Sequence, residues 1–175
     1  MSHYQRIACL STEAVETLYA LGAQDVIAGI SGFTVRPARA REEKTRISGF
    51  SSSNLERILA VEPDLVIGFC DMQADICRDL VMAGIEVHQF NQRTVDGILR
   101  MIAVLAALVR REDAGRELIA SLRTDIAAAR TRAAAWTRKP VMYFEEWNDP
   151  LMSGIGWAAE LIAIAGGADA FPELS

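Results

Sequence analysis

The stretch SSNLERILAVEPDLVIGF, residues 52–69, contains the signals that decide the fold. Ser53 and Glu56 have the spacing of a capping box, which predicts that a helix begins there and runs for about two turns. After a proline, residues 64–69 form an apolar, β-branched run typical of a strand buried in a parallel sheet. That strand ends on a phenylalanine, with Asp71 close behind, so an aromatic ring and an acid stand where a loop begins.

Strand and helix alternate on both sides of this stretch. Apolar runs predict strands at 7–10, 26–30, 64–69 and 86–90. Apolar residues at helical spacing, with capping signals, predict helices at 11–21, 53–61 and 72–83. The charged segment 31–49 is predicted to be a long connection. Strict alternation favours a parallel, Rossmann-like sheet with right-handed crossovers, so the fold class is α/β.

The alternation of strands and helices ends after residue 90, which closes a first lobe. Residues 94–136 are helical in pattern, and the charged run at 110–113 is expected to divide them into a short helix and a long strut. A strand at 141–144, a polar and aromatic loop at 145–150 and a helix at 156–165 follow. One strand and one helix cannot bury a core of their own, so the second α/β lobe looks unfinished. We therefore expect an N-terminal lobe over 1–110, an inter-lobe backbone helix over 111–138 and an incomplete C-terminal lobe over 139–175.

Composition narrows the class of partners. The net charge is -5 and the pI about 5.1, which argues against a nucleic-acid surface and against attraction to anionic membranes. No apolar segment is long enough to span a bilayer, so membrane insertion is not expected. The first residues lead directly into a short strand without a secretory signal, so the chain as given has the pattern of a cytoplasmic protein.

Chemistry-bearing motifs are sparse. Three cysteines and two histidines lack metal-ligand spacing, so neither a metal site nor a disulfide framework is expected. Cys70, Asp71 and His88 supply the residue types of a thiol triad, which leaves a small α/β enzyme using Cys70 as an alternative. No nucleophile-elbow, P-loop or dinucleotide-binding motif is present, and two adjacent glutamates do not form an acid–base pair by spacing. We expect a protein without catalysis or a catalytic cofactor.

Four segments of the chain together resemble a known family. They are RIACLSTEAVETLYALG, VIAGIS, ISGFSSSNLERILAVEPDLVIGF and YFEEWNDPLMSGIGWAAELIAIAGG. They are similar to periplasmic binding proteins with a rigid helical backbone, in the branch that carries cobalamin, ferric siderophores and haem to ABC importers. The resemblance implies two α/β lobes joined by one long helix, a ligand in the cleft between them, and hand-off to a membrane permease. Members normally continue for roughly another hundred residues.

The resemblance and the sheet geometry together predict the ligand contacts. Ligands of α/β sheets lie beyond the carboxyl ends of the strands, and a flat corrin or porphyrin needs broad aromatic contact with a few polar groups. The resemblance places Phe33, Phe50 and Phe69 where vitamin B12 carriers keep aromatic contacts. The full set of candidates is Phe33, Arg36, Phe50, Phe69, Asp71, Glu146, Trp147, Leu151 and Trp157. A cobalamin or other corrinoid is favoured, followed by a ferric siderophore or haem.

Three further expectations remain open at this point. Glu56 has two competing roles, because its carboxylate is predicted to cap its own helix and an acid in this helix contacts the transporter in B12 carriers. A homodimer formed through the unfinished second lobe is the alternative to transport. The family is exported, so either a signal has been removed or this member works in the cytoplasm, where free thiols persist.

Overall fold

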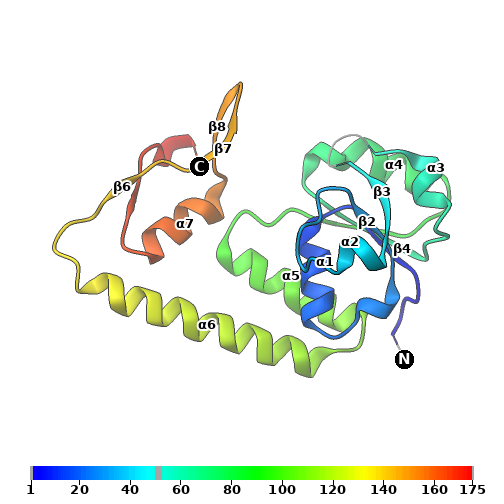
Figure 1. Cartoon of the computed structure of the whole chain (residues 1–175), viewed down its shortest axis with the longest axis horizontal. Helices are drawn as coiled ribbons and strands as arrows, with labels where there is room; N and C mark the ends of the chain where they lie inside the picture. The colour runs from blue at the N-terminus through cyan, green and yellow to red at the C-terminus, as the bar shows by residue number, and fades with distance from the viewer. Residues whose placement is uncertain (1, 50–52, 175) are drawn as a thin grey trace. The chain divides into compact units, whose positions relative to one another are not determined.

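The structure is a computed structural model that describes residues 2–49 and 53–174 (Figure 1). The residues group into two compact units. The first contains Met1–Gln92 and Met101–Leu118, and the second contains Arg93–Arg100 and Ile119–Ser175. Two helices, α5 (Val95–Leu108) and α6 (Glu112–Ala134), each contribute residues to both units. The predicted break between a short and a long helix is therefore confirmed.

The first unit contains a five-stranded sheet in the order β3-β2-β1-β4-β5. The strands are β1 (Ile7–Cys9), β2 (Ile27–Ser31), β3 (Thr45–Ser48), β4 (Leu65–Phe69) and β5 (Val87–Phe90). Every neighbouring pair is parallel. The predicted α/β class with a parallel sheet is confirmed.

Helices and helical turns connect these strands. They are α1 (Thr12–Ala20), η1 (Gln24–Val26), α2 (Ala40–Glu43), α3 (Leu55–Leu59), η2 (Asp71–Gln73) and α4 (Ala74–Met82). Ser11 caps α1 as its sequence position favours, since its hydroxyl accepts a hydrogen bond from the N–H of Ala14 at 3.3 Å. Side chains from the sheet and helices form the core, including Leu10, Ile58, Val66 and Leu80.

The edge strand β3 was not predicted, because residues 31–49 looked like a single loop. Its sequence TRIS offers one apolar residue, Ile47, and that side chain is fully buried. A Cβ atom added to Gly29 on β2 would lie 2.7 Å from Cγ2 of Ile47. The strand is therefore fixed by tertiary packing over a glycine, a contact that no local pattern in the sequence reveals.

The second unit contains two small sheets and a helix. Strands β6 (Val141–Met142) and β9 (Ala168–Asp169) pair in parallel, and α7 (Gly156–Ile164) precedes β9. The predicted strand at 141–144 is therefore shorter than expected. The predicted loop at 145–150 is wrong, because β7 (Glu145–Asn148) and β8 (Leu151–Ser153) form an antiparallel hairpin. A helical turn, η3 (Pro172–Leu174), is the last element of the described chain.

Within residues 2–49 and 53–174, no helix combines the length and the apolar composition needed to cross a bilayer.

Candidate functional site

The loops that follow the strands of the first unit meet at the carboxyl edge of its sheet. The loop after β2 reaches the end of β3, where the N–H of Gly32 donates to the carbonyl of Ser48 at 2.7 Å. The chain after β4 remains bonded to β5, since the N–H of Cys70 donates to the carbonyl of Phe90 at 2.8 Å. Neighbouring loops are thus anchored to one another at the edge where α/β proteins bind ligands.

Phe33 and Arg36 lie in the loop after β2. The N–H of Phe33 donates to the Ser31 hydroxyl at 3.3 Å, while 63% of the residue's surface is exposed. A large ring held by its backbone but left in solvent is available for contact. Arg36 forms an exposed ion pair with Glu16, at 3.3 Å between Nε and Oε2, so part of its charge is already compensated. Phe50, the third aromatic candidate, lies outside the described residues.

Phe69 and Asp71 flank the tight turn after β4. Phe69 is half-buried at the end of the strand, and Asp71 opens η2. Between them, Cys70 has a φ of +62°, a conformation that non-glycine residues seldom adopt. This backbone strain occurs at the sheet edge where the sequence predicts a ligand site, and such strain is often found at functional positions.

A buried glutamine that sequence reasoning missed holds this turn in place. The Gln73 side-chain oxygen accepts from the N–H of Phe69 at 3.0 Å, and its amide nitrogen donates to the carbonyl of Leu10 at 3.3 Å. Gln73 thereby joins the ends of two adjacent strands, β1 and β4. The only signal in the sequence was a polar residue four positions after the last residue of β4, and such a position alone predicts a surface residue.

Buried hydroxyl groups also lie beside the loops of this edge. Within the described residues, the side-chain oxygens of Thr34, Ser48 and Ser53 are buried and have no hydrogen-bond partner. A buried hydroxyl without a partner costs about 1–3 kcal/mol, so such groups normally bond to water or to a ligand. Ser48 and Ser53 also form an isolated antiparallel β-bridge.

The second-unit candidates lie on the β7–β8 hairpin and on α7. Trp147 is 60% exposed and Leu151 is 65% exposed, and Glu146 stands beside Trp147 on β7. The indole N–H of Trp147 donates to the carbonyl of Asp149 at 2.8 Å, which fixes the ring against the turn. Trp157 is half-buried in the first turn of α7.

Glu56 does not form the predicted capping box. Asn54, not Ser53, is the N-cap of α3, and its side-chain oxygen accepts from the N–H of Arg57 at 3.0 Å. This shift of one residue moves Glu56 to the second helical position, from which a carboxylate does not reach back as in the box. Glu56 is exposed, and no hydrogen bond or ion pair of its carboxylate occurs within the described residues.

The residues of the enzyme alternative are not arranged around one accessible thiol. Cys70 is buried beyond the end of β4, whereas His88 lies further back in the sheet, paired with Ile67. Burial lowers the pKa of His88 and raises the pKa of Cys9 to about 12, so Cys9 stays a neutral core thiol. Among the described residues, no group of three or more potential ligands could hold a metal ion.

The chain is similar to known binding proteins over nearly all its length. A model of the family described as "Periplasmic binding protein" matches residues 7–175. The vitamin B12-binding protein of Vibrio campbellii is 27% identical over 171 residues, which cover 95% of this chain but 61% of the relative. The chain therefore spans less than two thirds of that relative's length.

Solved structures share the fold. The periplasmic vitamin B12-binding protein of Vibrio cholerae superposes with a TM-score of 0.81 at 24% identity, covering 95% of this chain and 66% of that one. A periplasmic haem-binding protein from a Roseiflexus species gives the same TM-score and identity, with 97% and 66% covered. At these identities the superpositions establish the fold alone.

Proposed function

Because the chain belongs to the periplasmic binding protein family, we propose that it is the substrate-binding component of an ABC importer for a bulky metal-chelate ligand. A cobalamin or another corrinoid is the favoured ligand, followed by a ferric siderophore or haem. The observation that carries this choice is the similarity to a vitamin B12-binding protein over 95% of the chain. Domain roles follow: residues 1–110 form the first lobe, 111–138 the backbone helix and 139–175 the second-lobe part.

The chemistry of the carboxyl edge supports a large, flat ligand. Phe33 and Phe69 offer aromatic surface from two strand ends of the first unit. In the second unit, the exposed Trp147 is a separate aromatic candidate. Aromatic faces bind a macrocycle through broad apolar contact, while a few polar groups fix its orientation. Arg36 supplies such a polar group in the first unit.

Capture and release would then proceed without covalent chemistry. The ligand binds reversibly, and the loaded protein docks on the permease. Glu56 is the proposed contact with the transporter, because its exposed carboxylate is not used for helix capping. An exposed acid facing an arginine guides docking mainly through the association rate and its dependence on salt.

Titration with cyanocobalamin, haem and a ferric siderophore tests this proposal, with tryptophan fluorescence as the readout. The chain and a full-length relative such as the Vibrio campbellii protein should be titrated side by side. We expect saturable binding of cyanocobalamin by this chain, with a Kd in about the micromolar range. Binding of haem or siderophore alone would replace the corrinoid assignment, and the absence of binding to all three would refute the function.

A further inference from the structure

A buried tyrosine of α1, Tyr19, joins that helix to the connection between β2 and β3. Its hydroxyl donates to Oε2 of Glu43 at 2.7 Å, and the guanidinium carbon of Arg39 lies 4.9 Å from the centre of its ring. Arg39 immediately precedes α2, and Glu43 is the last residue of that helix. One side chain of α1 therefore contacts both ends of α2, through a hydrogen bond to a carboxylate and a cation–π contact.

The helix α2 depends on contacts of this kind. It has only four residues, Ala40–Glu43, whereas an isolated helix shorter than about 12 residues is marginal in water. The side chain of Ala40 is fully buried, so α2 is held by packing against the rest of the first unit. Tertiary contacts, including those of Tyr19, thus decide whether residues 40–43 stay helical.

Two ligand candidates, Phe33 and Arg36, lie between fixed points of the same connection. Before them, the Ser31 hydroxyl accepts from the N–H of Phe33 at 3.3 Å. After them, α2 is held by Tyr19. Glu16, three residues before Tyr19 on α1, pairs with Arg36 at 3.3 Å, but an ion pair this exposed contributes little to stability. Tyr19 is therefore the stronger of the two ties to α1.

We propose that Tyr19 is a positioning residue of the ligand site, which holds α2 and thereby keeps Phe33 and Arg36 ready for the ligand. The inference rests on the proposed function, because these two side chains are proposed ligand contacts. A segment that is fixed before the ligand arrives loses less conformational freedom on binding, so the Kd is lower. Tyr19 acts through the segment and needs no contact with the ligand.

Hydrogen exchange of the ligand-free chain tests the anchoring, independently of any ligand. Tyr19→Phe removes only the hydroxyl, so amides in peptides covering 33–43 should exchange about fivefold faster. Glu43→Ala removes the acceptor and should give a similar increase, whereas Glu43→Gln keeps a side-chain oxygen and should stay within about twofold of the parent chain.

A second tyrosine provides a matched control. The Tyr4 hydroxyl also donates to a glutamate, Oε1 of Glu86, at 2.7 Å. Both residues precede their strands, β1 and β5, so this bond lies at the amino edge of the sheet, opposite the proposed site. Tyr4→Phe should leave exchange in 33–43 unchanged. Circular dichroism establishes that each variant is folded.

Titration with cyanocobalamin tests whether the anchoring serves the site. Tyr19→Phe should raise the Kd by about threefold, and Tyr4→Phe by less than about 1.5-fold. In a Phe33→Ala/Arg36→Ala background, Tyr19→Phe should change the Kd by less than about 1.5-fold, because the side chains that it positions are absent.

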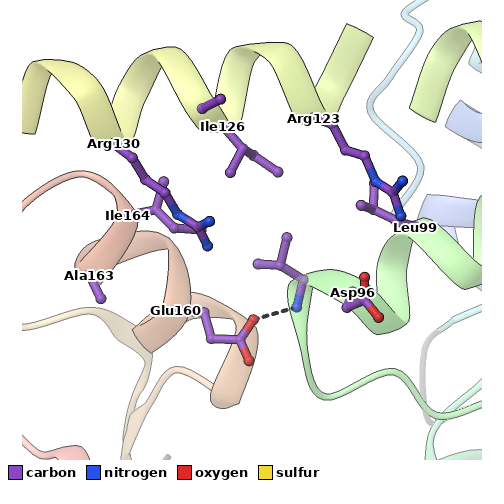
Figure 2. A pocket seen from close by; sticks show the side chains of 10 residues that line it. Asp96, Leu99, Arg123, Ile126, Arg130, Glu160, Ala163 and Ile164 are labelled. Atoms are coloured by element: carbon purple, nitrogen blue, oxygen red, sulfur yellow. Dashed lines mark hydrogen bonds between the residues drawn. The ribbon is translucent and has the colours of Figure 1, made fainter. Parts of the chain in front are cut away.

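The second unit also has an apolar groove, so binding there has to be distinguished from binding at the first unit. The groove encloses about 740 Å³ and is lined by the start of α5, the second half of α6 and α7 (Figure 2). Two arginines and two acids line it, so their charges balance. Ile126 lies between Arg123 and Arg130 in Figure 2, and Ile126→Ser should leave the Kd within about 1.5-fold of the parent value.

Four results would overturn the positioning role. They are unchanged exchange in 33–43 for Tyr19→Phe, an equal increase for Tyr4→Phe, a loss of affinity in Tyr19→Phe that persists without Phe33 and Arg36, and a loss in Ile126→Ser as large as that in Tyr19→Phe. A parent chain that binds none of the three proposed ligands refutes the proposed function, and with it the role at the site. The exchange comparison then shows separately whether Tyr19 anchors the segment.

Discussion

At the scale of single residues, the first unit presents Phe33 as its most accessible aromatic candidate. The ring is exposed while its backbone is anchored to Ser31, so truncating it removes contact surface without opening the core. Phe69 is half-buried at the end of a strand and also belongs to the proposed site, so its truncation would change stability and ligand binding together. Phe33 is therefore the residue on which ligand contact can be tested separately from stability.

We predict that Phe33→Ala weakens cyanocobalamin binding by about fivefold, because one aromatic contact contributes about 1 kcal/mol. Met82→Ala is the matched control, since Met82 is 82% exposed at the end of α4, away from the carboxyl edge. Both variants should unfold at the same urea concentration as the parent chain. Equal Kd values for the two variants would show that Phe33 does not contact the ligand.

A second residue-scale prediction concerns the start of α3. Asn54→Ala should lower the free energy of unfolding by about 1 kcal/mol, because it removes the cap that accepts from the N–H of Arg57. Glu56→Ala should change it by less than about 0.5 kcal/mol, the weak effect of an exposed acid near a helix N-terminus. Urea unfolding followed by circular dichroism measures both. A larger loss for Glu56→Ala than for Asn54→Ala would restore the capping-box interpretation.

At the scale of elements, the α5–α6 pair depends on one close approach. A Cβ atom on Gly115 of α6 would lie 2.5 Å from the Cβ of Ala106 on α5. The two helices therefore pack at a distance that only a glycine at this position allows. This contact lies within the first unit.

Gly115→Ala should destabilise the chain, because overpacking costs about 1–3 kcal/mol and exceeds the gain of about 1 kcal/mol in helix propensity. Ala106→Gly removes the opposing methyl group, so the double variant should be more stable than the sum of the two single effects by about 1 kcal/mol or more. Urea unfolding of the four proteins measures this coupling. Additive effects would mean that the helices separate without cost at this point.

The sequence predicted elements that carry their own local signals. The central strands, α1 with its Ser11 cap, and the break between α5 and α6 were all visible as apolar periodicity and capping residues. The elements that were missed depend on tertiary contacts. Strand β3 is fixed by burial of Ile47 over Gly29, and the hairpin at 145–153 has no periodic apolar pattern, since both its faces are largely exposed.

The candidate site also combines residues with a local sequence signal and residues whose role depends on tertiary contacts. Aromatic residues after strand ends could be found from sequence, because parallel strands end at one edge and a phenylalanine in a loop is conspicuous there. Gln73 could not be found, because its role comes from bonds to Phe69 and to Leu10, which is 63 residues away in sequence. The buried hydroxyl of Thr34 was equally invisible, since threonine in a loop usually faces water.

At the scale of the whole molecule, the central claim is that a corrinoid binds at the carboxyl edge of the first unit's sheet. Hydrogen exchange of the backbone amides with and without cyanocobalamin tests it most directly, because protection is located along the chain. We predict slower exchange in peptides covering 31–36 and 69–73, and unchanged exchange in α4. Saturating cyanocobalamin that protects neither of these two segments, or protects α4 instead, would contradict this claim.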